Sequence, residues 1–115
     1  MTDDEDDESS YSVEFHPSYT QSVAEVMIDI GLNRGYEAAQ VFNASIKQAE
    51  DEIIRNPMSG RSAKEVGRSR SVYAREKLCC YSKGKYLGSI GYEFRNDGIV
   101  RLIGFNLNAK QYISY

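Results

Sequence analysis

An apolar stripe at helical spacing runs through residues 34–55. Steps of three and four residues place five apolar side chains on one side of a helix. These side chains are Ala39, Phe42, Ile46, Ala49 and Ile53. Pro57 cannot continue a helix, so this helix should end just before it. A helix with one apolar side has to bury that side against another layer of structure, so the rest of the chain must form a surface that it can cover.

A second amphipathic helix is predicted just before the first, at residues 18–30. Ser18 followed by Gln21 matches a capping box, and Gly31 is a helix stop. The apolar stripe of this helix consists of Val23, Val26, Met27 and Ile30. Because Asn33 can cap the following helix, only a short link separates the two. The two helices should therefore form an antiparallel hairpin.

Outside the helices the apolar period changes to two, which is typical of strands. Strands are expected at residues 11–15, 71–81, 86–95 and 99–106. Residues 56–70, rich in glycine, serine and basic side chains, should form a loop. Residues 82–85 and 96–98 are the predicted turns, and Asn96-Asp97-Gly98 is a strong hairpin signal.

The order of these elements predicts an α+β fold. The three C-terminal strands should form an antiparallel meander, and the N-terminal strand should join the sheet at an edge beside the last strand. The expected result is one sheet of about four strands, with the antiparallel helix hairpin packed on one face.

Length and composition limit this fold to one domain. The chain has 115 residues, and residues 11–115 are expected to form the domain. Residues 1–10 contain six acids and are expected to be a disordered tail, because like charges repel and little there can be buried. No apolar stretch approaches the roughly 20 residues of a membrane span, and no secretory leader or membrane partner is expected.

One histidine and two adjacent cysteines nearly exclude a dedicated zinc site. His16 is expected to act as a turn and helix-cap residue. Cys79 and Cys80 are expected to be reduced thiols, because neighbours on a strand point to opposite faces and a bridge between them would be strained. Reduced thiols favour the cytoplasm, and neither a metal nor another cofactor is expected.

The net charge of −3 conceals a division along the chain. The nine bases of residues 55–85 are opposed only by Glu65 and Glu76. A basic middle of this kind is the electrostatic footprint of a phosphate-rich partner. Two alternatives stay open for these bases: they form a solvated surface, or they bind the chain's own acidic tail. If the tail does not bind them, it serves only solubility.

Alternation along the strand at 71–81 predicts two different faces. Tyr73, Arg75, Lys77, Cys79 and Tyr81 should share an exposed face, and Val72, Ala74, Leu78 and Cys80 should share the apolar one. Interleaved aromatic and basic side chains suit nucleic acid, whose bases stack and whose phosphates need positive charge. The alternative is a solvated strand with basic edge protection. The candidate nucleic-acid-binding residues are Arg61, Arg68, Arg70, Tyr73, Lys83, Lys85, Arg95 and Arg101.

Three stretches of the chain resemble the RelE/ParE superfamily, the small toxins of type II toxin–antitoxin modules. They are residues 11–17 (YSVEFHP), residues 55–61 (RNPMSGR), similar to the family's Pro-x-x-Gly loop, and residues 90–105 (IGYEFRNDGIVRLIGF). The resemblance covers about residues 11–112. It implies a RelE/ParE-like fold and a toxin, of the kind linked to plasmid stabilisation, that a cognate antitoxin neutralises.

The superfamily contains two kinds of toxin. RelE-like toxins cleave mRNA on the ribosome and so inhibit translation, without a metal, whereas ParE-like toxins poison DNA gyrase. By position, Arg75 and Lys77 resemble the paired bases of RelE-like enzymes, and Tyr112 resembles their C-terminal catalytic tyrosine. The resemblance therefore implies these three as the catalytic residues of an endoribonuclease.

The chain also departs from the RelE-like pattern. Residues 87–90 and 106–109 contain no base, where RelE-like enzymes carry an arginine. The basic and aromatic strand at 71–81 and Tyr112 nevertheless favour the endoribonuclease, and a gyrase poison, which needs no such cluster, is the alternative. A third reading is a non-enzymatic phage or plasmid binding module that kept the fold.

Overall fold

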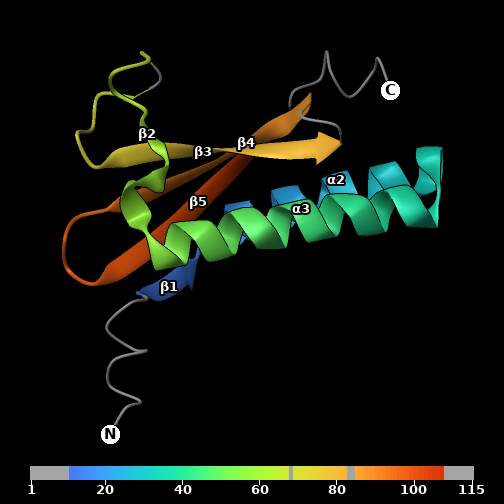
Figure 1. The fold of residues 1–115 in the computed structure, drawn as a ribbon, viewed down its shortest axis with the longest axis horizontal. Coiled ribbons are helices and arrows are strands. Elements are labelled where there is room, and N and C mark those ends of the chain that lie inside the picture. Colours follow the sequence, from blue (N-terminus) through green and yellow to red (C-terminus); the bar gives the residue numbers. More distant parts are fainter. Residues whose placement is uncertain (1–10, 68, 83–84, 108–115) are drawn as a thin grey trace, which may run out of the picture.

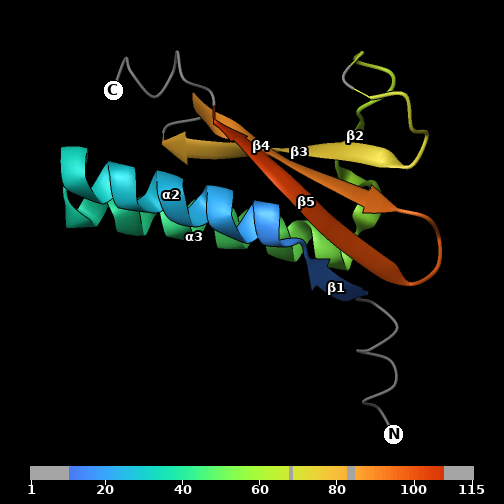
Figure 2. The ribbon, with the colours of Figure 1, turned by 180° about the vertical axis from the view of Figure 1, so that it is seen from behind.

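Two long helices lie side by side against one mixed sheet (Figure 1). The structure is a computed structural model that describes residues 11–67, 69–82 and 85–107. Its elements are β1 (Ser12–Phe15), α2 (Pro17–Arg34), α3 (Tyr36–Arg55), the short 3-10 helix η1 (Pro57–Ser59), β2 (Arg61–Ser62), β3 (Ala74–Ser82), β4 (Lys85–Phe94) and β5 (Ile99–Leu107). Seen from behind, α2 runs beside β5 (Figure 2).

A single glycine separates the two helices. α2 continues through Gly31, so the stop predicted there is wrong. Gly31 lies within the helix beside α3, where a Cβ would be 3.8 Å from that of Ala39. The hairpin turns instead at Gly35, whose φ of 98° favours glycine. Asn33 does not cap α3, because its amide donates to Asp29 within α2.

His16 caps the start of α2. Its Nδ1 accepts a hydrogen bond from the backbone N–H of Ser18 at 3.1 Å, and Pro17 occupies the first helical position. The prediction that His16 is a cap residue is therefore confirmed. The predicted capping box of Ser18 and Gln21 is wrong, because the hydroxyl of Ser18 donates to the carbonyl oxygen of Ile103 at 2.6 Å.

The sheet has five strands in the order β1-β5-β4-β3-β2. β1 pairs in parallel with β5 at one edge, as predicted, and β3, β4 and β5 form the predicted antiparallel meander. Asn96 and Gly98, with φ of 65° and 82°, form the turn between β4 and β5. The α+β fold is thus confirmed, with one strand more than expected: β2 lies in the predicted loop and pairs with β3.

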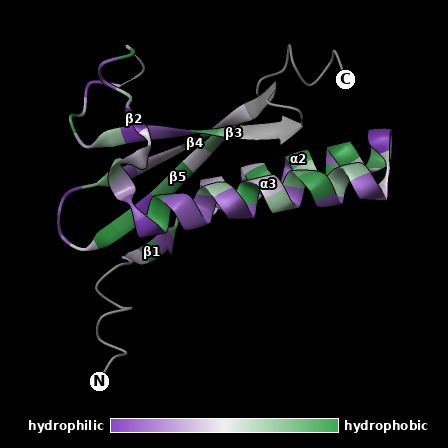
Figure 3. Cartoon of the chain, viewed as in Figure 1, coloured by the Kyte–Doolittle hydropathy of each residue, from purple (hydrophilic) through white to green (hydrophobic). Residues whose placement is uncertain are grey.

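The core lies between the helices and one face of the sheet. All members of the α3 stripe except Ala39 are buried, and the ring of Phe42 meets that of Phe105 edge-on at 5.8 Å between centroids. Apolar and hydrophilic residues alternate along both helices (Figure 3). The amphipathic pattern of α3 therefore predicted its buried side correctly.

The face of β3 that packs against the helices is the one that was predicted to be exposed. Cys79 was expected on the exposed face, yet it is 1% exposed and belongs to the core. Arg75 and Lys77 share its face, because alternate residues of a strand point the same way. Val72, expected to be buried, is 59% exposed. The aliphatic stems of arginine and lysine can cover a partly buried surface while their charged ends reach polar partners.

Candidate functional site

Arg75 holds the segment that links α3 to β2. Its Nε and Nη2 donate to the carbonyl oxygen of Gly60, at 3.2 and 2.5 Å. Nη2 also lies 3.5 Å from the carbonyl oxygen of Met58. A guanidinium presents its donors as a rigid planar fork, which suits this grip on backbone carbonyls. Arg75 therefore has a structural role, because it fixes this segment to β3.

Tyr92 of β4 holds the same segment from the core side. Its Oη accepts from the N–H of Gly60 at 3.1 Å and donates to the carbonyl oxygen of Pro57 at 2.5 Å. Burial raises the pKa of Tyr92, so its hydroxyl stays protonated and keeps donating. Sequence reasoning missed this residue. The available signal was its alternation with Ile90 and Phe94, because a tyrosine on a core face needs a partner for its hydroxyl.

Lys77 forms an ion pair with α3. Its Nζ lies 2.9 Å from Oε1 of Glu52, and the lysine side chain is only 17% exposed. The hydrogen bond from Lys77 holds the pKa of Glu52 below its ordinary value of 4.5. The two predicted catalytic bases of β3 thus lie on one face, and each is engaged with a different part of the protein.

Arg61 is paired on β2. Its Nη2 and Nε lie 3.0 and 3.1 Å from Oε1 of Glu76, whose side chain is 6% exposed. A cavity of about 290 Å³ lies between this pair and the pair of Lys77 with Glu52. Each base there has its own carboxylate, so the cavity carries no excess of positive charge for a phosphate.

Arg101 lies on β5, and β4 separates it from the bases of β3 in the sheet. On β5 its Nε is 3.3 Å from Oε1 of Glu14, and its Nη2 is 3.1 Å from Oδ2 of Asp97. A hydrogen bond from the backbone N–H of Ile99 lowers the pKa of Asp97, and the nearby charge of Arg101 lowers it further. This arginine ties β1 to the β4–β5 turn.

Two of the candidate nucleic-acid-binding residues, Tyr73 just before β3 and Arg95 just after β4, lie in contact. Cζ of Arg95 lies 4.6 Å from the centroid of the Tyr73 ring, and the tyrosine is 39% exposed. Arg70, three residues earlier in the chain, is exposed. An exposed aromatic ring with an arginine beside it is a platform on which nucleic-acid bases can stack.

The remaining predicted residues lie outside the described residues. These are Arg68, Lys83 and Tyr112; Lys85 begins β4, and its side chain is also outside that part. The structure therefore places Arg75 and Lys77 on one face of β3 and Tyr73 beside Arg95, and it pairs Arg101 with Glu14 and Asp97. The catalytic roles of Arg75, Lys77 and Tyr112 stay predictions.

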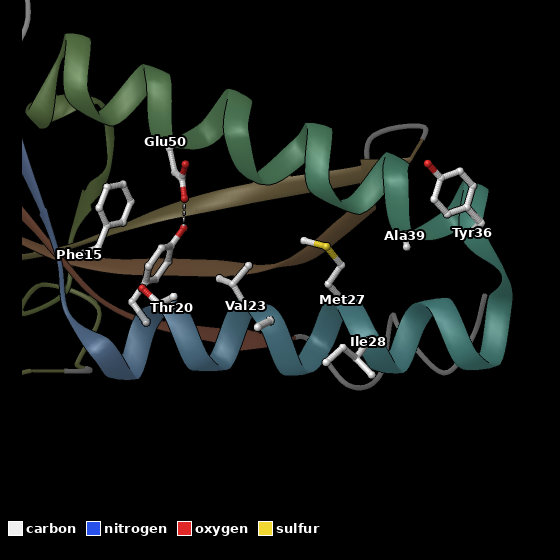
Figure 4. A pocket seen from close by; sticks show the side chains of 10 residues that line it. Phe15, Thr20, Val23, Met27, Ile28, Tyr36, Ala39 and Glu50 are labelled. Atoms are coloured by element: carbon white, nitrogen blue, oxygen red, sulfur yellow. Dashed lines mark hydrogen bonds between the residues drawn. The ribbon is translucent and has the colours of Figure 1, made fainter.

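An apolar groove of about 760 Å³ runs between α2 and α3 (Figure 4). Val23 and Met27 of α2 point towards α3, and Ile28, Tyr36 and Ala39 line the groove near the turn between the helices. At one end, the hydroxyl of Tyr19 donates to Oε2 of Glu50 at 2.5 Å. Ile28 is 62% and Tyr36 75% exposed. The groove thus exposes apolar side chains from both helices, which makes it a candidate site for binding another protein.

Neither a metal centre nor a membrane span is found in the described part of the chain. No three histidine, cysteine, aspartate or glutamate side chains are grouped there closely enough to hold a metal ion. No helix in the same residues is long and apolar enough to cross a bilayer.

Comparison with known proteins gives a likeness of fold. No protein-family model matches the sequence, and no curated protein matches it. Among solved structures, the chain is similar to a chain of one described as "Chromosomal ParDE TA system from P. aeruginosa". The TM-score is 0.62 at 11% sequence identity, and the match covers 85% of this chain and 96% of that chain. The RelE/ParE-like fold that the resemblance implied is therefore confirmed.

Proposed function

We propose that this protein is the toxin of a type II toxin–antitoxin module and acts in the cytoplasm. The observation that carries the proposal is the fold, which is shared over 96% of a chain from a chromosomal ParDE system. Three sequence stretches, one of them the segment that Arg75 and Tyr92 hold, resemble the same superfamily. The fold and the sequence thus support the same class of protein.

The engagement of the β3 bases favours a toxin that acts by binding, with DNA gyrase as its target. A metal-independent ribonuclease needs bases that can stabilise charge on the scissile phosphate. Here Arg75 donates to Gly60, and Lys77 is 2.9 Å from a carboxylate oxygen of Glu52. A substrate would have to displace these partners, whereas a gyrase poison needs no catalytic cluster.

A ribonuclease acting on mRNA at the ribosome is the second candidate. The observation in its favour is the pair of Tyr73 and Arg95, which combines an exposed ring with a cation at 4.6 Å. Such a pair suits single-stranded RNA, whose unpaired bases stack on aromatic side chains. In this case Arg75, Lys77 and Tyr112 are the proposed catalytic residues.

The proposed antitoxin binds in the groove between α2 and α3. The exposed apolar side chains there fit an amphipathic segment, which would bury its own apolar face against them. Neutralisation then depends on residues such as Ile28 that take no part in the toxic activity.

Induction of the chain alone in bacteria tests these proposals. We would measure growth, mRNA integrity and DNA supercoiling in the same cultures. Gyrase poisoning predicts DNA damage and filamentation with intact mRNA, and ribonuclease action predicts cleaved mRNA with translation arrest. Harmless accumulation of folded protein would refute the toxin proposal and would favour a non-enzymatic binding module.

A further inference from the structure

Tyr11, the first residue that the structure describes, contacts two residues that each precede an arginine. The backbone N–H of Tyr11 donates to the carbonyl oxygen of Ile54 at 3.1 Å, and its ring lies edge-on to that of Phe94 at 5.2 Å. Arg55 follows Ile54 in the sequence, and Arg95 follows Phe94. Each of the two residues that Tyr11 contacts is therefore followed directly by an arginine.

Arg70 and Tyr73 extend this basic surface. The N–H of Phe94 donates to the carbonyl oxygen of Tyr73 at 3.2 Å, and Arg95 lies over the Tyr73 ring. Arg70 is three residues from Tyr73, so their Cα atoms are at most about 11 Å apart. We define Arg55, Arg70, Arg95 and Tyr73 as the root cluster.

The arginines of the root cluster can accept a further ligand. Arg55 and Arg70 are exposed and make no ion pair with any residue that the structure describes. Arg95 contacts Glu93 through Nε at 3.3 Å, and within the described residues its terminal nitrogens form no ion pair. This distinguishes the cluster from Lys77 and Arg101, whose charges are matched by carboxylates.

We propose that the acidic segment of residues 3–8 binds the root cluster. The segment contains Asp3, Asp4, Glu5, Asp6, Asp7 and Glu8, and only two serines separate it from Tyr11. At about 3.6 Å per residue, Glu8 reaches about 11 Å from Tyr11 and Asp3 about 29 Å. Tethering raises the local concentration of carboxylates towards the millimolar range, which offsets the weakness of each exposed ion pair.

Charge-removing variants of the full chain test this contact from the acidic side. The first variant is Asp6→Asn, Asp7→Asn, Glu8→Gln. The matched control, Glu25→Gln, Asp29→Asn, Glu37→Gln, removes the same charge from the two helices. At about 10 mM salt, the first variant should shift the NMR signals of the Nε–H groups of the root-cluster arginines, and the control should leave them unchanged. At about 0.5 M salt, where the Debye length is about 4 Å, the difference should vanish.

The reciprocal experiment changes the basic side. Arg55→Gln with Arg95→Gln should shift the backbone amide signals of residues 3–8, whereas Arg34→Gln with Lys47→Gln should not. Unchanged arginine signals in the acidic variant, or equal responses to the test and control variants, would overturn the proposal. The measurement does not depend on toxicity, so it stands or falls separately from the proposed function.

Discussion

Gly60→Ala should destabilise this protein, although the backbone at Gly60 suits alanine. Its φ of −81° and ψ of 166° are ordinary extended values. By conformational entropy alone, replacing glycine with alanine there would stabilise the fold by about 0.4–1 kcal/mol. A Cβ at this position, however, would lie 2.5 Å from the backbone oxygen of Glu76 and 2.5 Å from Oη of Tyr92. The Glu76 oxygen belongs to β3 and cannot move aside, so we expect a net loss of about 1–3 kcal/mol, as for overpacked cores.

Gly31→Ala is the matched control for this substitution. A Cβ there would lie 3.8 Å from that of Ala39, which is an ordinary contact, and the position is inside α2. Alanine should therefore stabilise the helix by about 0.5–1 kcal/mol. Thermal and urea unfolding would measure both variants, and each kcal/mol should move the Tm by roughly 4–8 °C. A Gly60→Ala protein as stable as its parent would refute the argument that β3 closes over this glycine.

Three further predictions concern the core, the Lys77 ion pair and the groove. Phe42→Ala should cost about 3–5 kcal/mol, because Phe42 is fully buried, and a shift in Tm of only a degree or two would contradict its core position. Since the folded pKa of Glu52 is below 4.5, its pair with Lys77 stabilises the fold above that pH, and the contribution fades as the pH falls through the folded pKa. Lys77→Met should therefore flatten the acid limb of the stability curve, and an identical acid limb in parent and variant would argue against the pair. Ile28→Asp should leave the fold and the toxicity intact but prevent rescue by the antitoxin, as growth on co-expression would show.

The sequence predicts the helices and the meander because these depend on patterns within each element. The period of the stripe that contains Phe42 and Ile46 identifies the buried side of α3, and Asn96-Asp97-Gly98 identifies a turn. The helix boundary at Gly31 was wrong for a physical reason. A glycine commonly ends a helix where the chain takes a positive φ. In this protein that position is Gly35, so α2 continues past Gly31 to Arg34 before the chain turns into α3.

The faces of β3 could not be predicted from alternation alone. Both faces contain polar and apolar side chains, so the pattern does not say which one meets the helices. The orientation of β3 depends on contacts with residues distant in the sequence. Lys77 pairs with Glu52 and Arg75 donates to Gly60, whereas on the other face Glu76 pairs with Arg61. The count of bases in residues 55–85 has the same weakness, because it does not include the carboxylates that the fold brings beside them.

Arg75 shows how these contacts change the meaning of a mutation. Arg75→Ala would leave the carbonyl oxygen of Gly60 without two charged donors, and hydrogen bonds to charged groups contribute about 1.5–3 kcal/mol each when buried. Because this contact is partly exposed, we expect a total loss nearer to about 1–2 kcal/mol. A loss of toxicity in Arg75→Ala would then have two explanations. Tyr92→Phe separates them, because it weakens the same segment from the core side and leaves every base in place. If Tyr92→Phe matches Arg75→Ala in stability but keeps full toxicity, Arg75 acts on the target itself; if both lose toxicity in proportion to stability, its role is to hold the segment.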